Sequence, residues 1–142
     1  MKTIAVDASV AIKWFLPEIH YQSAVLLLKS KYEIIAPDLI LAEFGNILWK
    51  KTNLKEITPQ QAEDILKDFI RFPIQTVSSK FLLSSAYKLA YETSTTVYDC
   101  LYLVLAQSRE CSLVTADKKF YESITKKRRQ AKIIWIEDFD EK

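Results

Sequence analysis

Short apolar runs rich in β-branched residues alternate along this 142-residue chain with longer stretches whose apolar positions recur at helical spacing. Short apolar runs bounded by polar or turn-forming residues are typical of buried strands. The pattern predicts five strands, at residues 3–6, 33–36, 74–77, 112–115 and 132–136.

The segments between these runs carry the start and stop signals of helices. Thr58 precedes Pro59 and stands three residues before Gln61, which predicts an N-cap, a proline at the first helical position and a capping box. Asp38 begins another helical stretch that ends in two lysines, in keeping with the helix dipole. In all, helices are expected at residues 9–15, 21–30, 38–51, 58–72, 79–92, 96–109 and 118–126.

Strands that alternate with helices predict a parallel sheet covered on both faces. We therefore expect a single α/β domain over residues 1–142, an α/β/α sandwich with a five-stranded parallel sheet. In such folds, ligands bind beyond the carboxyl ends of the strands. The chain has one glycine, Gly45, and so no glycine-rich phosphate loop, which excludes P-loop NTPases and dinucleotide-binding Rossmann enzymes.

The amino-acid composition limits where in the cell the protein is expected and which site chemistry is open to it. Hydrophobic residues make up 49% of the chain, but its longest apolar runs fall well short of the ~20 residues that span a membrane. No membrane segment is expected, and because the chain starts directly with a strand pattern, without a leader, we expect a cytoplasmic location. Cys100 and Cys111 lack metal-ligand spacing and are interpreted as reduced apolar side chains, and a single histidine, His20, argues against histidine-based chemistry.

Two carboxylates follow the tips of apolar strands. Asp7 is the first residue after one predicted strand and is followed two residues later by Ser9, and Asp117 comes two residues after Thr115, the last residue of another. Desolvating a charge at the tip of an apolar strand is costly, so such positions call for an explanation. The carboxyl ends of parallel strands are where an active site belongs.

Two further carboxylates lie on apolar helices. Glu43 shares a largely apolar face with Ile40, Ile47 and Asn46, and no cation stands three or four residues away. Asp99 is in the first turn of a helix that is apolar almost all round, where the helix dipole favours a negative charge.

Simpler explanations exist for three of these acids. Asp7 and Asp117 could cap the helices that follow them, and Asp99 could stabilise a helix dipole. Glu43 has no such role, and one shared site explains all four together. Converging like charges destabilise a fold unless cations lie between them. Oxygen ligands without His or Cys select Mg²⁺ or Mn²⁺, ions that activate water and stabilise charge on a phosphodiester.

Four segments resemble the motif blocks of PIN-domain nucleases, most closely the VapC-type toxins of prokaryotic toxin–antitoxin pairs. They occur in order over most of the chain: VDASVAIKWFLPE, APDLILAEFGNILWK, TVYDCLYLVLAQ and LVTADKKFY. The resemblance implies a five-stranded parallel sheet with flanking helices, and cleavage of RNA with Mg²⁺ or Mn²⁺. It also implies a homodimer, and a small antitoxin protein encoded beside the toxin that holds it inactive.

By this resemblance, an acidic quartet holds the metal: Asp7, Glu43, Asp99 and Asp117. Asp7 and Asp99 are expected to bind the principal ion most directly. The other two complete the shell, bind a second ion or orient the attacking water. Ser9 and Thr115 are expected to support the site by hydrogen bonds to carboxylates or to the scissile phosphate.

Other features have two interpretations each. Basic residues after the last acid are a candidate surface for steering RNA, or a solvated loop: Lys118, Lys119, Lys126, Lys127, Arg128, Arg129 and Lys132. The role of the segment 126–132 stays open. Tyr98 and Tyr102 flank Asp99 and are expected in the core, with base stacking as the alternative. Apolar residues 14–16, 48 and 49 are also expected in the core, with a partner-binding patch as the alternative.

The leading interpretation is a metal-dependent endoribonuclease, the toxin of a type II toxin–antitoxin pair, in which a metal-bound water attacks RNA. The alternatives are an RNA-processing nuclease outside such a system and a catalytically inactive RNA-binding or scaffold module. An aspartyl phosphatase is disfavoured because the sequence after the first strand is Asp7-Ala8-Ser9, with one aspartate instead of two. A receiver domain is disfavoured because the third strand has no terminal aspartate.

Overall fold

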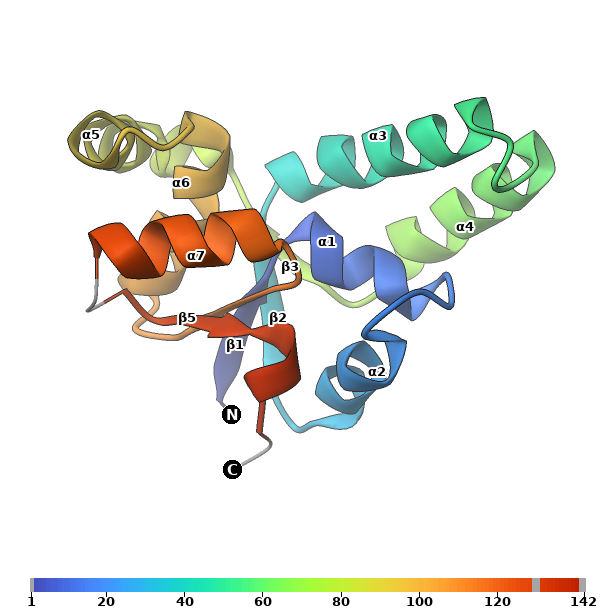
Figure 1. Ribbon diagram of the computed structural model, residues 1–142, viewed down its shortest axis with the longest axis horizontal. Coiled ribbons are helices and arrows are strands. Elements are labelled where there is room, and N and C mark those ends of the chain that lie inside the picture. Colours follow the sequence, from blue (N-terminus) through green and yellow to red (C-terminus); the bar gives the residue numbers. More distant parts are fainter. Residues whose placement is uncertain (1, 129–130, 141–142) are drawn as a thin grey trace.

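The sheet has five strands, all parallel, in the order β3-β2-β1-β4-β5 (Figure 1). The computed structural model describes residues 2–128 and 131–140. Its strands are β1 Thr3–Val6, β2 Glu33–Pro37, β3 Gln75–Val77, β4 Leu113–Thr115 and β5 Ile133–Trp135. The predicted parallel α/β fold is confirmed, and every predicted strand limit is within one residue of the observed one.

Seven α-helices occur in the described chain: α1 Ala8–Ala11, α2 Tyr21–Lys29, α3 Leu39–Asn53, α4 Pro59–Arg71, α5 Leu83–Thr93, α6 Val97–Ser108 and α7 Lys118–Lys127. Short 3-10 helices add η1 Ile12–Trp14, η2 Ser79–Phe81 and η3 Ile136–Asp138. Two predicted helices are divided, since 9–15 becomes α1 with η1 and 79–92 becomes η2 with α5. Within the described ranges, no helix has the length and apolar character needed to span a membrane.

Hydrogen bonds explain where two of the helices begin. The Thr58 hydroxyl accepts from the Gln61 amide at 3.1 Å, and the Gln61 side chain accepts from the Thr58 amide at 2.8 Å, so the predicted capping box is confirmed. Asp38 behaves differently, because its side chain does not cap its own helix. It accepts from the Ser79 amide at 3.0 Å and from the Ser79 hydroxyl, which ties the start of α3 to η2.

β1 lies between β2 and β4, and the chain winds outward from it in both directions. The chain first adds β2 and β3 on one side of β1, then crosses through α5 and α6, and adds β4 and β5 on the other side. Such a reversal of strand order is a topological switch point, and a crevice forms outside the carboxyl ends of the strands beside it. Asp7 directly follows β1 at this point.

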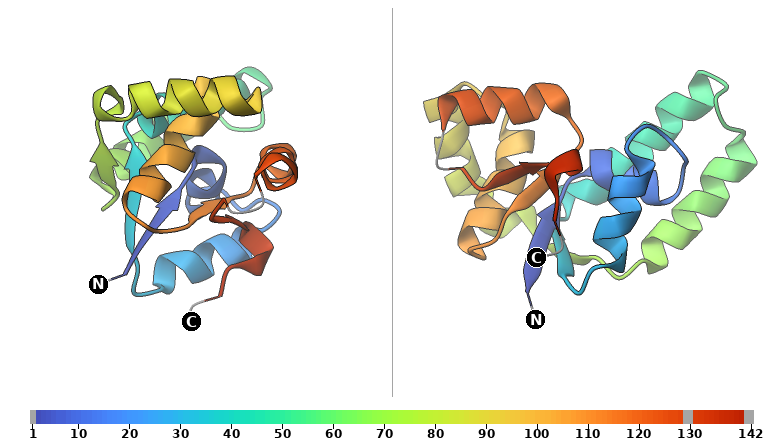
Figure 2. Two further views of the ribbon diagram at one scale, coloured as in Figure 1. Left: turned by 90° about the vertical axis from the view of Figure 1, so that its left-hand side faces the viewer. Right: turned by 60° about the horizontal axis from the view of Figure 1, so that its bottom comes forward.

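α6 is the central helix of the apolar core. It packs against β1, β2 and β4, and α5 packs against α6 (Figure 2). Its residues from Cys100 to Ala106 are all buried, as its apolar sequence predicts. Cys100 is buried and Cys111 is half-buried, and neither is in a disulfide within the described residues.

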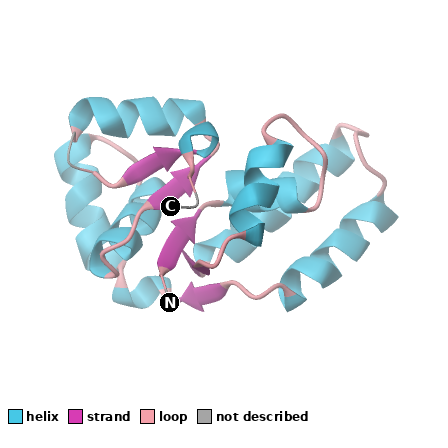
Figure 3. Cartoon of the chain, turned by 90° about the horizontal axis from the view of Figure 1, so that it is seen from below, coloured by secondary structure: helices cyan, strands magenta, loops and turns pink. Residues whose placement is uncertain are grey.

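α3 and α4 form a hairpin that extends from the sheet, and Figure 3 shows it from below. Aromatic rings fill its base. Phe44 stacks on Phe69 with ring centroids 3.7 Å apart, and Phe15 meets both rings edge-on. Phe15 and Leu48 pack in or against the core as predicted, whereas the prediction for Trp49 is wrong, because its side chain lies on an exposed face of α3.

Candidate active site

The carboxyl edge of the sheet opens into a cavity of about 480 Å³. All four predicted acids line it: Asp7, Glu43, Asp99 and Asp117. They come from the end of β1, the second turn of α3, the first turn of α6 and the residue before α7. Ser9 lines the cavity too, whereas Thr115 is fully buried and reaches the site through its bond to Asp7. The structure thus brings acids from four distant segments around one space.

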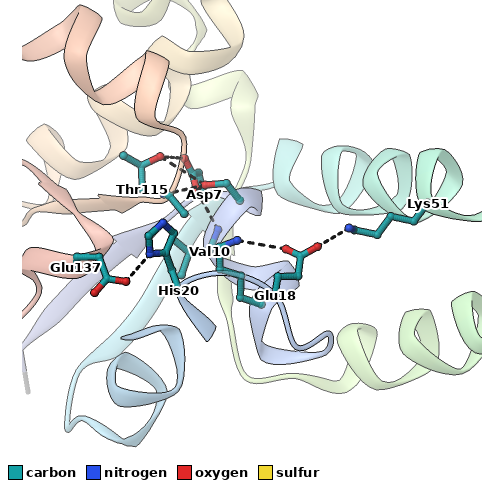
Figure 4. Close-up of polar contacts among 10 residues, drawn as sticks. Asp7, Val10, Glu18, His20, Lys51, Thr115 and Glu137 are labelled. Carbon is teal, nitrogen blue, oxygen red and sulfur yellow. Dashed lines mark hydrogen bonds and ion pairs between the residues drawn. The ribbon is translucent and has the colours of Figure 1, made fainter. Parts of the chain in front are cut away.

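Three hydrogen bonds hold Asp7 (Figure 4). Its Oδ1 accepts from the Ser9 hydroxyl at 2.5 Å and from the Val10 amide at 3.3 Å, and its Oδ2 accepts from the Thr115 hydroxyl at 2.5 Å. The bond from Val10 makes Asp7 the N-cap of α1. Because both carboxylate oxygens accept bonds and the residue is 7% exposed, its orientation is fixed.

The Ser9 and Thr115 hydroxyls join the tips of β1 and β4. Ser9 Oγ accepts from the Ala116 amide at 2.9 Å, and Thr115 Oγ1 accepts from the Asp117 amide at 3.0 Å. Each hydroxyl therefore bonds both to Asp7 and to the backbone at or next to Asp117. This network sets the relative position of two of the four acids.

The simpler capping roles are present as well. Asp117 accepts from the Phe120 amide at 3.1 Å and caps α7, and Asp7 caps α1. Asp99 lies in the first turn of α6, after the N-cap Thr96. Capping and cavity lining are compatible, because a carboxylate has more acceptor sites than a cap uses. The caps also explain how three of the acids are held at the sheet edge.

Glu43 has a partner that sequence reasoning did not assign. Tyr102 Oη donates to Glu43 Oε1 at 2.5 Å, and Tyr102 is 2% exposed. Burial and the Glu43 charge raise the pKa of Tyr102 above its usual range, so the phenol stays protonated and donates. Its position one helical turn after Asp99 was the available signal. Tyr102 is in the core as predicted, but Tyr98 is 62% exposed, so the prediction of core packing is wrong there.

Burial and mutual repulsion raise the pKa values of three of the acids. Burial raises the pKa of Asp7 to about 6, although its hydrogen bonds act against this change. Burial also raises the pKa of Asp99 to about 6, and the charges of Asp117 and Glu43 add to the effect. The pKa of Glu43 is raised by burial and by the Asp117 charge, against the bond from Tyr102. A proton or a cation is therefore favoured at this site near neutral pH.

The donor chemistry fits a hard divalent cation, because the acids that line the cavity offer oxygen ligands only. In residues 2–128 and 131–140, no group of three or more His, Cys, Asp or Glu side chains is placed to hold a metal ion. Mg²⁺ commonly keeps several waters and takes one or two carboxylates directly. An ion that binds one or two of these carboxylates and keeps several waters is compatible with this lining.

The basic residues near the site face different partners. Lys119 lines a second cavity beside the first, whereas Lys118 lies over the Trp135 ring at 4.7 Å. Arg128 forms an ion pair with a glutamate of α5 at 2.5 Å. Arg129 lies outside the described residues. Among the predicted basic residues that the structure describes, Lys119 alone borders a cavity that the acids also line.

An acid-lined cavity at the switch point of an all-parallel sheet defines an α/β protein with a candidate site for a cation and a charged ligand. The sequence pattern of the PIN domain matches residues 4–123. The chain therefore belongs to the PIN domain family, and the predicted membership is confirmed. Ribonuclease VapC3 of Pyrobaculum aerophilum is 28% identical over 121 residues, which are 84% of this chain and 92% of that protein.

Three solved structures share the fold. PAE2754 from Pyrobaculum aerophilum has a TM-score of 0.69 at 23% identity and covers 96% of this chain and 85% of its own. VapC20 of Mycobacterium tuberculosis, a sarcin-ricin loop cleaving toxin, has a TM-score of 0.65 at 13% identity. The match covers 85% of this chain and 95% of that one. VapBC2 from Rickettsia felis, solved bound to a DNA fragment from their promoter, has a TM-score of 0.63 at 14% identity. The match covers 97% of this chain and 99% of that one. At these identities the likeness establishes the fold.

Proposed function

We propose that this protein is a metal-dependent endoribonuclease that hydrolyses RNA phosphodiester bonds. The observation that carries the proposal is the meeting of four carboxylates from distant segments around one cavity at the carboxyl edge of the sheet. Membership of the PIN domain family and the similarity to ribonuclease VapC3 support the reaction class. Mg²⁺ or Mn²⁺, when bound, would supply an activated water and stabilise charge on the phosphate.

The residues around the cavity have distinct tasks in this proposal. Asp7 and Asp99 hold the ion, since these are the carboxyls whose pKa rises to about 6 and for which a cation relieves the largest cost. Glu43 and Asp117 complete the negative shell and orient water near the ion. The two hydroxyls bonded to Asp7 keep its carboxylate in one orientation, as supporting groups around metal ligands do.

RNA cleavage by the purified protein, with and without Mg²⁺ or Mn²⁺, tests the proposal. We expect cleavage with the ion, none after chelation, and cleavage slower by about 100-fold or more in Asp99→Asn, because a charged ligand is lost. Asp68→Asn, on an exposed part of α4, is the matched control and should cleave like the wild type. Cleavage that persists in Asp99→Asn contradicts the site. No cleavage by any variant favours the inactive RNA-binding or scaffold alternative.

We further propose that the nuclease is the toxin of a toxin–antitoxin pair, acts in the cytoplasm as a homodimer, and is held inactive by a small antitoxin. The similarity to ribonuclease VapC3 and to the VapC20 toxin supports this. Induced wild type should arrest growth of a host cell, Asp99→Asn should not, and light scattering should give twice the chain mass of 16.5 kDa. RNA cleavage without growth arrest favours the RNA-processing alternative.

A further inference from the structure

A second cavity, of about 340 Å³, adjoins the acid-lined one. Asp99 and Asp117 line both, so the two spaces meet at this pair of acids. The rest of the second lining is Ser94, Thr95, Thr96, Lys119, Phe120 and Ser123. We call the two cavities together the groove. A groove that continues on both sides of the acids is shaped for a polymer that passes across them.

The wall formed by residues 94–96 is held in place by the helices on either side of it. Ser94 ends α5 in the left-handed region, with φ of 54°. The Thr95 amide donates to the Ala90 carbonyl at 3.3 Å. The Thr96 hydroxyl accepts from the Asp99 amide at 3.1 Å and caps α6. Because each residue of this turn is tied to a helix, this side of the groove is preformed.

Each half of the groove has one lysine in its lining. Lys50 lines the first cavity and Lys119 lines the second. In the part of the chain that the structure describes, neither takes part in an ion pair, whereas Lys51 pairs with Glu18. In a nucleic-acid backbone, the scissile phosphate has a further phosphate on each side. Two exposed ammonium groups on opposite sides of an acidic centre are suited to contact these flanking phosphates.

Tyr98 provides an aromatic surface at the same place. It lines the first cavity from the first turn of α6, next to Asp99, and is 62% exposed. An exposed ring beside a phosphate path is a stacking platform for a base, and such stacking requires a base that is not paired within a duplex. The Tyr98 ring is therefore placed to stack on a base that is unpaired.

We propose that three residues of the groove position the RNA across the acids. Lys50 and Lys119 contact phosphates on opposite sides of the scissile one, and Tyr98 stacks on an unpaired base beside it. This assignment rests on the proposed nuclease function and adds to it the three residues that position the substrate.

Steady-state cleavage of a fluorogenic single-stranded oligoribonucleotide tests the assignment. Lys119→Ala and Lys50→Ala should each raise KM by about 5-fold to 10-fold and leave kcat within about 2-fold of the wild type. Each should also reduce the slope of log KM against log salt concentration by about one, because one phosphate contact is lost. The matched controls are Lys118→Ala, one residue away over Trp135, and Lys55→Ala, beyond the end of α3. Both should behave like the wild type in KM and in salt slope.

Tyr98→Leu keeps helix propensity and removes the ring, so KM should rise by about 10-fold, and Tyr98→Phe should restore it. Tyr91→Leu, at a tyrosine that is also exposed but lies on α5 outside the groove, is the control. The same sequence closed into a duplex should be cleaved poorly, and Tyr98→Leu should change its KM by less than about 2-fold. Thermal melting of every variant checks that the fold is retained.

The outcomes separate this assignment from the nuclease proposal. If cleavage is intact but Lys119→Ala and Tyr98→Leu keep the wild-type KM, the assignment is overturned and the nuclease stands. If the wild type cleaves nothing, fluorescence anisotropy with the same oligonucleotide decides. If the same variants weaken oligonucleotide binding, the groove is supported as an RNA-binding site although the nuclease proposal fails. If the protein does not bind the oligonucleotide, or the variants bind it as tightly as the wild type, the assignment is overturned.

Discussion

At the scale of single residues, the acids differ in how firmly the protein holds them. Asp7 accepts three hydrogen bonds, whereas Glu43 accepts one, from the Tyr102 phenol at 2.5 Å. That bond lowers the pKa of Glu43 while burial and the Asp117 charge raise it. Tyr102 therefore acts on the site through Glu43 and is a positioning residue.

Tyr102→Phe removes this bond and leaves the ring in the core. The pKa of Glu43 should rise further, so the acid limb of the pH–rate profile for RNA cleavage should move to higher pH. A hydrogen bond to a charged group contributes about 1.5–3 kcal/mol, so the rate should fall about 10-fold or more at pH 6, and less at pH 8. Tyr32→Phe, outside the acid-lined cavity, should leave the profile unchanged. A loss of rate that is equal at both pH values argues against the proposed role of Tyr102.

The acids were predictable because each one interrupts an apolar pattern at a strand tip or on a helix face. The two tyrosines beside Asp99 were not separable by pattern, since α6 is apolar almost all round. Tyr102 is buried and Tyr98 is exposed because of how α6 packs against α5 and the sheet, and that packing depends on long-range contacts. The Glu43–Tyr102 bond joins residues 59 positions apart, and its one local signal was the position of Tyr102 one helical turn after Asp99.

At the scale of elements, an ionic triad fastens the loop after η1 to α3. Glu18 accepts from Lys13 Nζ at 3.2 Å and also pairs with Lys51 of α3 (Figure 4 labels the Glu18–Lys51 pair). The Lys13 side chain is 8% exposed. Burial raises the pKa of Glu18, but the bonds from the two lysines outweigh it and lower the pKa overall. The triad holds α1 and η1 against the helix that carries Glu43.

Glu18→Gln leaves the buried Lys13 without a charged partner and should lower the free energy of unfolding by about 3 kcal/mol. Urea denaturation measures this change. Replacing Lys13 by Met in the same variant should recover most of the loss, because the uncompensated charge is removed. Glu63→Gln, on an exposed part of α4, is the control and should change stability by less than about 0.5 kcal/mol. A similar loss in the single and the double variant contradicts the explanation.

The elements themselves were largely predictable, because apolar runs and caps such as Thr58 with Gln61 are local features. What sequence reasoning missed depends on distant partners. Asp38 stands at the start of a helical stretch, but its side chain bonds to Ser79, 41 residues away. The division of residues 79–92 into η2 and α5 adjoins the same contact.

At the scale of the whole molecule, the acid-lined cavity makes stability depend on pH. Asp7 and Asp99 have pKa values of about 6 in the folded chain, against 3.8 in the absence of burial. Between about pH 4 and pH 6 the folded state therefore binds more protons than the unfolded state. The stabilisation by these protons is complete below about pH 4 and is lost as the pH rises through 6. For Asp7 alone the loss is on the order of 3 kcal/mol.

Asp7→Asn should flatten this dependence, because Asn does not titrate. The difference in free energy of unfolding between wild type and variant, measured by urea denaturation from pH 4 to pH 7.5, isolates the contribution of Asp7 from that of Glu18. Glu18 acts in the opposite sense, because its pKa is lowered. Relative to Asp7→Asn, the wild type should lose stability through this range. A difference that does not change with pH contradicts the assignment.

A divalent cation should reverse the loss, because it binds the ionised carboxylates of the folded chain and compensates the charge that burial makes costly. At pH 7.5 the melting temperature should therefore rise with Mg²⁺ or Mn²⁺, by an increment that grows with the logarithm of the ion concentration above Kd. Asp99→Asn should lose most of this response and, in the absence of the ion, should melt above the wild type. Asp68→Asn should keep the full response. An equal rise in all three proteins places the ion elsewhere than at the four acids, whatever the cleavage assay shows.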